Sequence, residues 1–216
     1  MKIENTDKQQ IMDFIRQAKH VAVVPSKVVG ADAYCAAAGL YHMLLESGKE
    51  ATLVHEGKVP TDCEDLVTES DVSANVSERD LIVTIDYSNL QNATSAHYST
   101  DNDVLTIRIG PVPKDFDSGR VKSKVTGFNF DLVFVIGAQG FVDLGTTFRN
   151  LQSEFERAKV VNIDITNRNE RFGVANVIDT TADSLSTLVF SESILWGLTP
   201  GKKSARAFLT GIAHRD

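Results

Sequence analysis

Short apolar runs alternate along this chain with longer stretches in which apolar residues recur at helical spacing. Residues 20–24, 131–137 and 160–164 are nearly continuous apolar runs, the pattern of strands covered on both faces. Residues 50–55 read as a further strand. Helical spacing is found in residues 6–19, 32–47, 148–159, 181–196 and 205–215. This order predicts an α/β fold with a mostly parallel sheet and helices on both faces.

Residues 80–129 have a different pattern, with β-type alternation of apolar and polar residues at 93–100 and 104–109. Segments 80–86, 93–100, 104–109 and 121–128 read as extended. The residues between the second and third of these, Ser99 to Asp103, are typical of turns. We therefore expect a β-hairpin insertion at 80–129 within a single α/β domain that spans 1–216. The preceding stretch, 60–77, is polar and acidic and predicts a loop or a short helix.

The predicted helix at 32–47 carries unusually small side chains and ends at Gly48, a residue suited to a helix C-cap. The small residues are Ala33, Cys35, Ala36, Ala37, Ala38 and Gly39. They predict a helix that lies close to the sheet, with Cys35 in the core.

The segment from Val160 to Ser184 places an apolar strand, an aspartate at its carboxyl end and a polar loop in succession. Open α/β sheets bind ligands at such strand ends. The segment resembles the third motif of the DHH phosphoesterase family (the RecJ-like and nanoRNase group), N-I-D-H-H-x-x-N-x-x-F-G-x-x-N-x-x-D-x-x-A-x-S. The matching positions are Asn162, Ile163, Asp164, Asn169, Phe172, Gly173, Asn176, Asp179, Ala182 and Ser184. Ile165 and Thr166 stand where that family has its two histidines.

Three further segments resemble other motifs of the same family. Residues 26–39 resemble the first, H-x-N-P-D-G-D-A-x-G-S-A-L-A-L, with Ser26 at its histidine, Gly30 at its first aspartate and Asp32 retained. Residues 131–145 resemble the second motif, with Gly137 at the position of its aspartate. Residues 205–215 resemble the fourth, with Arg215 at an aspartate position.

Family members hydrolyse phosphoric esters with two divalent cations, usually manganese, so the resemblance implies a phosphoesterase fold. The positions that it implies for metal ligands hold Ser26, Gly30, Asp32, Gly137, Ile165, Thr166 and Arg215, with Asp164 beside them. Only the two aspartates keep a carboxylate, whereas a hard divalent cation takes about six ligands. Without a metal the pKa of the attacking water stays near about 15.7 instead of about 7, roughly 12 kcal/mol of nucleophile activation.

These departures predict a catalytically degenerate relative, a pseudoenzyme that uses no metal or other cofactor. Asp32 and Asp164 would be vestiges of the catalytic set. Asp32 also has a simpler interpretation as an N-cap or first-turn carboxylate of its helix. The protein would then be a protein-interaction module or would bind a nucleotide or phosphate.

The predicted ligand-binding residues are Ser26, Thr166, Asn167 and Arg215. The alternative is a divergent phosphoesterase that hydrolyses short oligonucleotides or small nucleotide phosphates. It would hold one manganese or magnesium ion on Asp32 and Asp164, with Asp86 or Asp143 as a further ligand.

Composition limits the kinds of binding partner that we expect. A net charge of −7 and a pI near 5.2 do not provide the broad basic face that extensive nucleic-acid binding requires. The two cysteines, Cys35 and Cys63, show neither metal-ligand spacing nor a disulfide framework. No apolar run reaches about 18 residues and the first residues lack a signal-like apolar segment, so we expect a cytoplasmic protein that does not enter a membrane.

The hairpin insertion offers a surface for a homodimer or a partner chain, and an oligomeric structural role is the third interpretation. Active members of the resembled family carry a further C-terminal domain, of the DHHA type, that grips the substrate. This sequence ends at Asp216, where the linker to that domain would begin. The resemblance therefore implies that a partner chain supplies that half of the cleft or that no such cleft is used.

Overall fold

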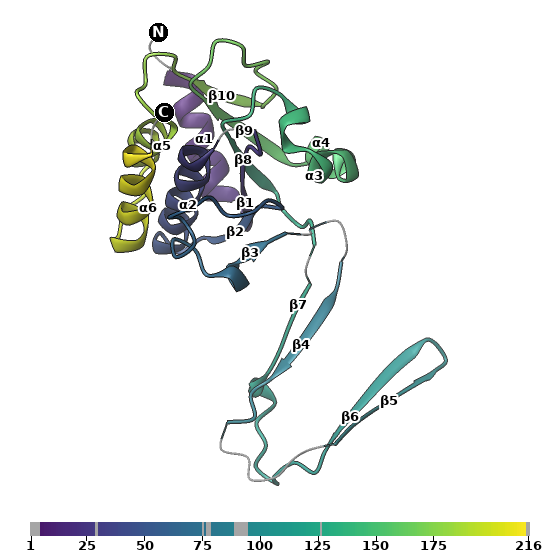
Figure 1. The fold of residues 1–216 in the computed structure, drawn as a ribbon. Helices are drawn as coiled ribbons and strands as arrows, with labels where there is room; N and C mark the ends of the chain where they lie inside the picture. The colour runs from purple at the N-terminus through teal and green to yellow at the C-terminus, as the bar shows by residue number, and fades with distance from the viewer. Residues whose placement is uncertain are drawn as a thin grey trace. The chain divides into compact units, whose positions relative to one another are not determined.

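The computed structural model describes residues 5–28, 30–74, 76, 79–88, 95–125 and 127–214. Six of its strands form one sheet in the order β10-β9-β8-β1-β2-β3, in which every neighbouring pair is parallel (Figure 1). They are β1 (His20–Pro25), β2 (Glu50–Val54), β3 (Val72–Ser73), β8 (Leu132–Ile136), β9 (Lys159–Asp164) and β10 (Ala175–Ile178). The predicted α/β fold with a mostly parallel sheet is confirmed.

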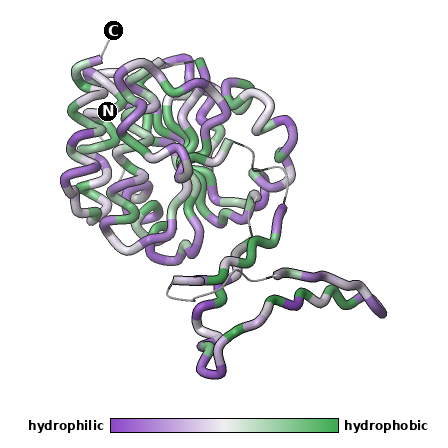
Figure 2. The backbone as a smooth tube through the Cα atoms, turned by 60° about the horizontal axis from the view of Figure 1, so that its bottom comes forward, coloured by the Kyte–Doolittle hydropathy of each residue, from purple (hydrophilic) through white to green (hydrophobic). Residues whose placement is uncertain are grey.

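Helices cover both faces of this sheet. One face carries α1 (Asn5–Gln17), α2 (Ala31–Glu46), α5 (Leu185–Leu195) and α6 (Lys202–Ala213), and the other carries η3 (Phe141–Leu144), α3 (Thr146–Asn150) and α4 (Gln152–Arg157). Successive residues of a strand point to opposite faces, so Val21 and Val23 of β1 join the first core and Ala22 and Val24 join the second. The strands are accordingly apolar through the middle of the body (Figure 2).

Helix α2 is buried on nearly all sides, and every residue from Ala33 to Leu44 is buried. One side of the helix contacts the sheet, and the other contacts α5 and α6. The small residues therefore do more than was predicted, because they admit two outer helices as well as the sheet. A Cβ on Gly39 would lie 2.5 Å from the Phe208 ring of α6, and one on Gly211 would lie 2.8 Å from Cys35 Cβ.

Two sequence predictions are wrong in detail. The single helix at 148–159 is broken into α3 and α4, because Leu151 leaves the helical region (φ −127°, ψ 23°) and buries its side chain near Phe155. The polar stretch 60–77 contains η1 (Glu69–Asp71) followed by β3, an edge strand of the sheet that was not predicted. A strand of two residues is too short to show a period in the sequence.

Residues 80–126 form a compact unit of their own, distinct from the unit made by residues 1–79 and 127–216. In it β4 (Leu81–Ile85) pairs antiparallel with β7 (Val121–Val125), which follows η2 (Ser118–Arg120). Separately, β5 (Ser95–Asp101) pairs antiparallel with β6 (Val104–Gly110). The predicted hairpin of 93–100 and 104–109 is present from residue 95 on. The single-domain organisation with an insertion at 80–129 stays a prediction.

Over the described ranges, no helix is both long and apolar enough to cross a membrane.

Replacing Gly211 by Ala should destabilise the larger unit. The new Cβ would meet Ser186 Oγ, which is able to rotate away, and also Cys35 Cβ, which is fixed to the backbone of α2. Overpacking of this kind costs about 1–3 kcal/mol, against about 1 kcal/mol that Ala gains over Gly in helix propensity. We expect a net loss of about 1 kcal/mol in denaturant unfolding. Lys203→Ala, an exposed change on the same helix, is the control. Equal stability of the two variants would contradict the close approach.

Candidate functional site

The order of the strands defines a switch point in the sheet. From β1 the chain proceeds outward through β2 and β3, whereas β8, β9 and β10 extend on the other side of β1. The connection that leaves β1 and the one that leaves β8 therefore run in opposite directions along the sheet. In open α/β sheets, ligands bind at the carboxyl ends of the strands at such a point. The carboxyl ends of these strands are the place to look for a site.

Three positions singled out by the resemblance lie side by side at this edge. Pro25 of β1 is in register with Ile136 of β8, and Ile136 with Ile163 of β9. The next residues, Ser26, Gly137 and Asp164, follow as a row. Backbone hydrogen bonds tie the row together, from Ser26 N to Ile136 O (2.8 Å) and from Gly137 N to Ile163 O (2.9 Å).

Asp164 is buried at the end of β9, and protein donors satisfy both of its carboxylate oxygens. Ile165 N donates to Oδ1 (2.8 Å) and Asn169 Nδ2 donates to Oδ2 (2.9 Å). Burial raises the pKa of Asp164, and these hydrogen bonds oppose the rise without cancelling it. The carboxylate is thus held in place by its own loop.

The asparagines of the third motif build that loop. Asn162 Nδ2 donates to Asn169 Oδ1 (2.6 Å) and to Asn176 Oδ1 (3.1 Å), while Asn169 Nδ2 donates to Ala138 O (2.7 Å). A Cβ on Gly173 would lie 2.6 Å from Ala175 O, so no larger residue fits at this position of the loop. These matched residues give the loop its shape.

Asp32 is a first-turn carboxylate of α2, as one interpretation of the sequence held, but it also has a role that neither interpretation included. It lies in the first turn of α2, but the N-cap of that helix is Gly30, which makes no side-chain hydrogen bond. The Asp32 carboxylate instead accepts hydrogen bonds from Leu185 N (2.6 Å) and Ser186 N (3.0 Å). Together with Ser184, whose Oγ accepts from Thr187 N (3.0 Å), it caps the first turn of α5.

The predicted ligand-binding residues are only partly brought together. Ser26 is buried in the row and its Oγ accepts from Val28 N (3.1 Å). Thr166 is half-buried just beyond Asp164, and its Oγ1 accepts from Arg168 N (3.3 Å). Asn167 is exposed beside it. Arg215 lies outside the described residues.

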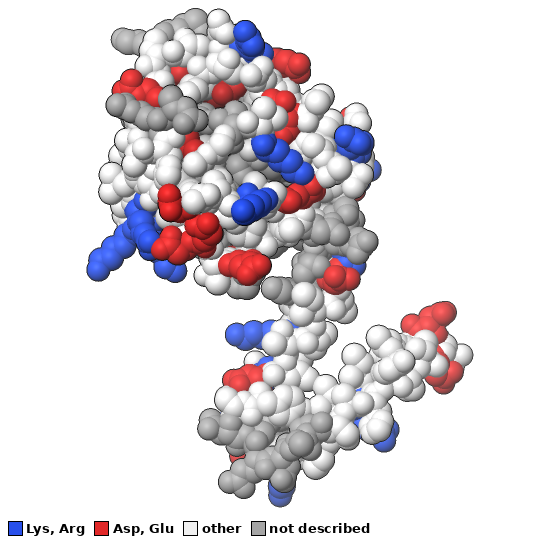
Figure 3. Space-filling model, viewed as in Figure 1, with Lys and Arg blue, Asp and Glu red and all other residues white. Residues whose placement is uncertain are grey.

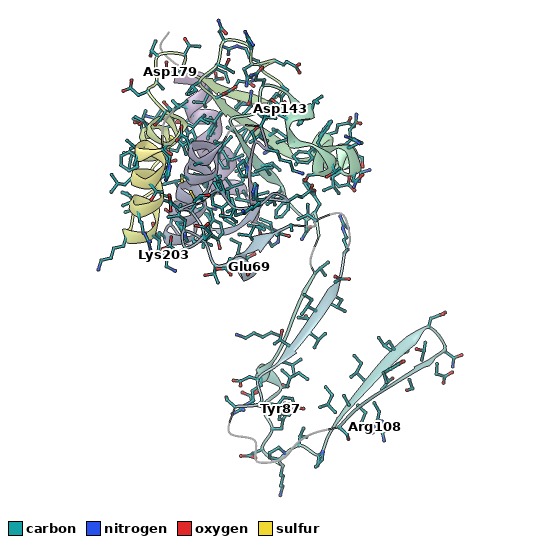
Figure 4. All side chains as sticks on the ribbon, viewed as in Figure 1. Glu69, Tyr87, Arg108, Asp143, Asp179 and Lys203 are labelled. Carbon is teal, nitrogen blue, oxygen red and sulfur yellow. The ribbon has the colours of Figure 1, made fainter. Side chains whose placement is uncertain are left out.

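The additional carboxylates of the alternative hypothesis are also engaged. Asp143 Oδ2 accepts from Gln139 N (2.8 Å), and Figure 4 shows Asp143 and Asp179 at the same end of the larger unit. Asp86 belongs to the other unit, where Oδ1 accepts from Ser88 N (2.8 Å). Among the described residues, no three His, Cys, Asp or Glu side chains are grouped so that they could hold a metal ion.

A polar cluster at the carboxyl ends of β1 and β2 was missed by the sequence analysis. Lys27 Nζ forms an ion pair with Glu56 Oε2 (2.5 Å), and Glu56 also accepts hydrogen bonds from the hydroxyls of Thr146 (2.5 Å) and Thr147. Burial disfavours ionisation of Glu56, but these hydrogen bonds and the Lys27 charge outweigh it and lower its pKa. The four residues come from three distant segments, so no local pattern predicts them.

Buried polar atoms without partners lie next to this cluster. Tyr34, in the first turns of α2, packs edge-on against His55, which follows β2 (ring centroids 5.1 Å apart). Within the described ranges, neither the Tyr34 hydroxyl nor His55 Nδ1 has a hydrogen-bond partner. Burial, followed by the nearby Cys63 and Cys35, raises the pKa of Tyr34 to about 12, and burial lowers the pKa of His55. Such atoms call for a ligand or a water molecule.

The two cysteines are also closer than their spacing suggested. Their Sγ atoms are 3.4 Å apart, and both thiols are free and buried. Burial, reinforced by the hydrogen bond that the Cys35 thiol makes to Cys63, raises the pKa of Cys35, so the thiol form is favoured. Cys35 is a core residue, as predicted.

Two surface hollows lie elsewhere, at the amino ends of the strands. One, of about 630 Å³, is bordered by α1 and Lys159, and the other, of about 410 Å³, by His20 and Arg157. We place the candidate site at the opposite edge, because the row, the Glu56 cluster and the switch point coincide there.

The structure defines an α/β protein with a mostly parallel sheet and helices on both faces. A solved structure with this fold is an exopolyphosphatase-related protein from Bacteroides fragilis, which superposes with a TM-score of 0.66 at 14% sequence identity. The match covers 97% of this chain and 49% of that protein, so the chain spans about half the length of its structural neighbour. No family model and no curated protein matches the sequence.

Replacing Asp32 by Ala should loosen the junction of α2 and α5. Two backbone N–H groups lose a charged acceptor, which we expect to lower the free energy of unfolding by about 1–3 kcal/mol in a denaturant titration. Asp183→Ala removes a carboxylate from the same neighbourhood at an exposed position and serves as the control. If both variants lose the same amount, Asp32 does not cap α5.

Glu56 should contribute stability that depends on pH. Its pKa is lower in the folded protein, so its contribution is present above the ordinary value of 4.5 and is lost as the pH falls through the lower folded value. We expect Glu56→Gln to cost about 1 kcal/mol at pH 7, a modest figure because Lys27 is 30% exposed.

The difference between wild type and Glu56→Gln should shrink below pH 4.5. Thermal unfolding of both proteins between pH 3 and pH 7 measures it, with the exposed Glu64→Gln as the matched control. A difference that does not change with pH would show that the loss is one of packing alone.

Proposed function

We propose that this chain is a catalytically inactive relative of the DHH phosphoesterases that binds a phosphate-bearing ligand, of which a nucleotide is the best candidate, at the carboxyl edge of its sheet. The observation that carries this proposal is the row of Ser26, Gly137 and Asp164 at the switch point, in which the carboxylate is already satisfied by the protein. The fold agrees with that of an exopolyphosphatase-related protein. The expected cytoplasmic location stays a prediction.

The side chains at the edge do not suit a pair of divalent cations. Such a pair needs several hard ligands with free lone pairs directed at shared positions. The Asp32 carboxylate is directed to the backbone of α5, and that of Asp164 to its own loop. Ser26 and Gly137 bring no carboxylate to the row. Metal-assisted hydrolysis is therefore not part of the proposed mechanism.

The same edge has features that suit an anion. Helix α2 begins just beyond Ser26 with no side chain capping its first turn, so its N–H groups and the positive end of its dipole face the edge. The Ser26 and Thr166 hydroxyls can donate to a phosphate oxygen, and exposed Asn167 adds an amide donor. The Lys27 charge stands at the end of the row, although Glu56 neutralises it in the absence of a ligand. The ligand would be bound and oriented, with no group present to activate water.

Binding and turnover should separate in one set of measurements. The purified chain is titrated with adenosine monophosphate by calorimetry, and is assayed with manganese and bis(p-nitrophenyl) phosphate for hydrolysis. We expect binding without turnover, and binding weakened about tenfold in Thr166→Ala, as the loss of one hydrogen bond to a charged group predicts. Thr210→Ala, whose hydroxyl bonds to Arg206 O on α6, should bind like wild type.

Two results would overturn this proposal in different ways. Manganese-dependent turnover that disappears in Asp164→Ala would favour the divergent phosphoesterase. If the folded protein does not bind the nucleotide at millimolar concentration, the proposed ligand site is wrong. Only the description of the fold would then stand.

A further inference from the structure

The two cysteines of this chain lie against each other in the larger unit, although 28 residues separate them in the sequence. Cys35 is in the second turn of α2, and Cys63 is in the segment between β2 and η1. Their Sγ atoms are 3.4 Å apart, both thiols are free, and neither side chain is exposed. A buried residue contacts about 6–12 others, so the only two cysteines among 216 residues would seldom be neighbours by chance. The contact therefore calls for a chemical explanation.

Polar groups surround the thiol pair. Tyr34 precedes Cys35 on α2, and the nearby Cys63 and Cys35 contribute to the rise in its pKa, so its hydroxyl is close to both sulfurs. The ring of His55 packs edge-on against Tyr34. Over the described part of the chain, the Tyr34 hydroxyl has no hydrogen-bond partner. A thiolate that forms in this cluster would have a free hydrogen-bond donor near it.

The two thiols differ in how firmly they are held. Cys35 lies on α2, which is enclosed by the sheet and the outer helices. Cys63 lies in a short turn whose residues on both sides are exposed, and two backbone hydrogen bonds close that turn, from Cys63 N to Pro60 O (3.1 Å) and from Leu66 N to Cys63 O (3.2 Å). Local opening of such a turn breaks few contacts. Cys63 is therefore the thiol that a small molecule reaches, and the one able to move the roughly 1.4 Å that separates this contact from a disulfide bond.

We propose that Cys35 and Cys63 form a reversible intramolecular disulfide, by exchange with a small disulfide molecule, that fastens the segment after β2 to α2. The Cys63 thiolate attacks one sulfur of the small molecule, and a mixed disulfide forms as the first small thiolate leaves. The Cys35 thiolate then attacks the Cys63 sulfur and expels the second small thiolate. The two protein thiols are oxidised, the small disulfide is reduced to two thiols, and the protons of Cys35 and Cys63 end on them.

The bond closes a ring that contains most of α2, β2 and the segment that carries His55 and Glu56. That segment borders the candidate site, because Glu56 pairs with Lys27 at the end of the row. Oxidation would thus restrict the segment at the carboxyl ends of β1 and β2. The inference goes beyond the proposed function and does not rest on it, since no ligand takes part in the exchange.

The charge around the turn selects among small disulfides. Acidic and basic side chains are interspersed on the face of the larger unit that Figure 3 shows, so an excess of one sign is local. Such an excess occurs at the turn, where Asp62, Glu64 and Asp65 are exposed and Arg206 pairs with Asp65. The remaining negative charge attracts a cationic disulfide such as cystamine and repels an anionic one such as oxidised glutathione. We therefore expect cystamine to be the better oxidant.

The wild-type chain tests the proposal without any substitution. Reduced protein in native buffer at about pH 8.5 is incubated with excess cystamine, quenched with acid, and treated with a maleimide in denaturant before mass spectrometry. Burial raises the pKa of both thiols, so alkaline pH favours the attacking thiolate. We expect a product that is lighter by two hydrogen atoms and takes up no maleimide, and a linked peptide that contains Cys35 and Cys63. Dithiothreitol should reverse both changes.

Two results would overturn the proposal. In one, both thiols stay free in the native protein under conditions in which the denatured protein is oxidised. In the other, cystamine adds to one or both cysteines and no bond closes between them. Either result would mean that the two thiols only pack against each other.

The separate roles of the two thiols are tested by single substitutions. Cys35→Ala removes the second nucleophile, so the cysteamine adduct should remain on Cys63. Cys63→Ser leaves only the thiol that α2 encloses, and this thiol should stay unmodified over the same time. The reverse result would contradict entry of the oxidant at the turn, as would equal rates with cystamine and oxidised glutathione at low salt.

Stability provides a further readout. The ring restricts the unfolded chain, so oxidation should lower the unfolding equilibrium constant on the order of 100-fold in a denaturant titration. Amide exchange in residues 55–66 should become slower. Cys63→Ser treated in the same way with cystamine is the control and should show neither change. A disulfide that destabilises the wild-type protein would contradict a fold that accepts the bond in its native state.

Discussion

The close packing of α2 between the sheet and the α5–α6 pair is the constraint on which the rest of the larger unit depends. It requires small side chains on several sides of one helix, and the sequence supplies alanines, Cys35 and Gly39. On α6, Gly211 likewise permits the close approach, because it has no side chain. Because the helices approach so closely, Asp32 reaches the first turn of α5 and satisfies two of its N–H groups. One carboxylate thereby joins the segment after β1 to the C-terminal helices.

The carboxyl edge of the sheet is held in shape by contacts within the protein itself. The row at the switch point and the asparagine loop depend on backbone register and on amide hydrogen bonds, neither of which needs a metal. The carboxylates that remain are satisfied by protein donors, and the Lys27–Glu56 pair places a compensated charge at the end of the row. An edge of this kind contributes to the stability of the fold by itself, and the anion site that we propose is built on it.

The two units differ in how far the apolar faces of their sheets are covered. In the larger unit a parallel sheet is covered on both faces, as parallel sheets require. In residues 80–126 each sheet has only two strands, and the apolar side chains of β4 and β7, such as Leu81 (69% exposed) and Val125 (56% exposed), remain accessible as those of β5 and β6 do. Residues 80–126 therefore bury much less of their apolar surface than the larger unit does.

The sequence by itself determined the α/β fold and most of the strands and helices, because continuous apolar runs and helical spacing are local properties. It did not determine β3, which is too short to have a period, or the break at Leu151, which tertiary burial imposes. Only the tertiary structure decided that Asp32 caps α5 and that Lys27, Glu56, Thr146 and Thr147 meet. The partners of these side chains are 29 to 154 residues away in the chain, and only folding brings them within hydrogen-bond distance.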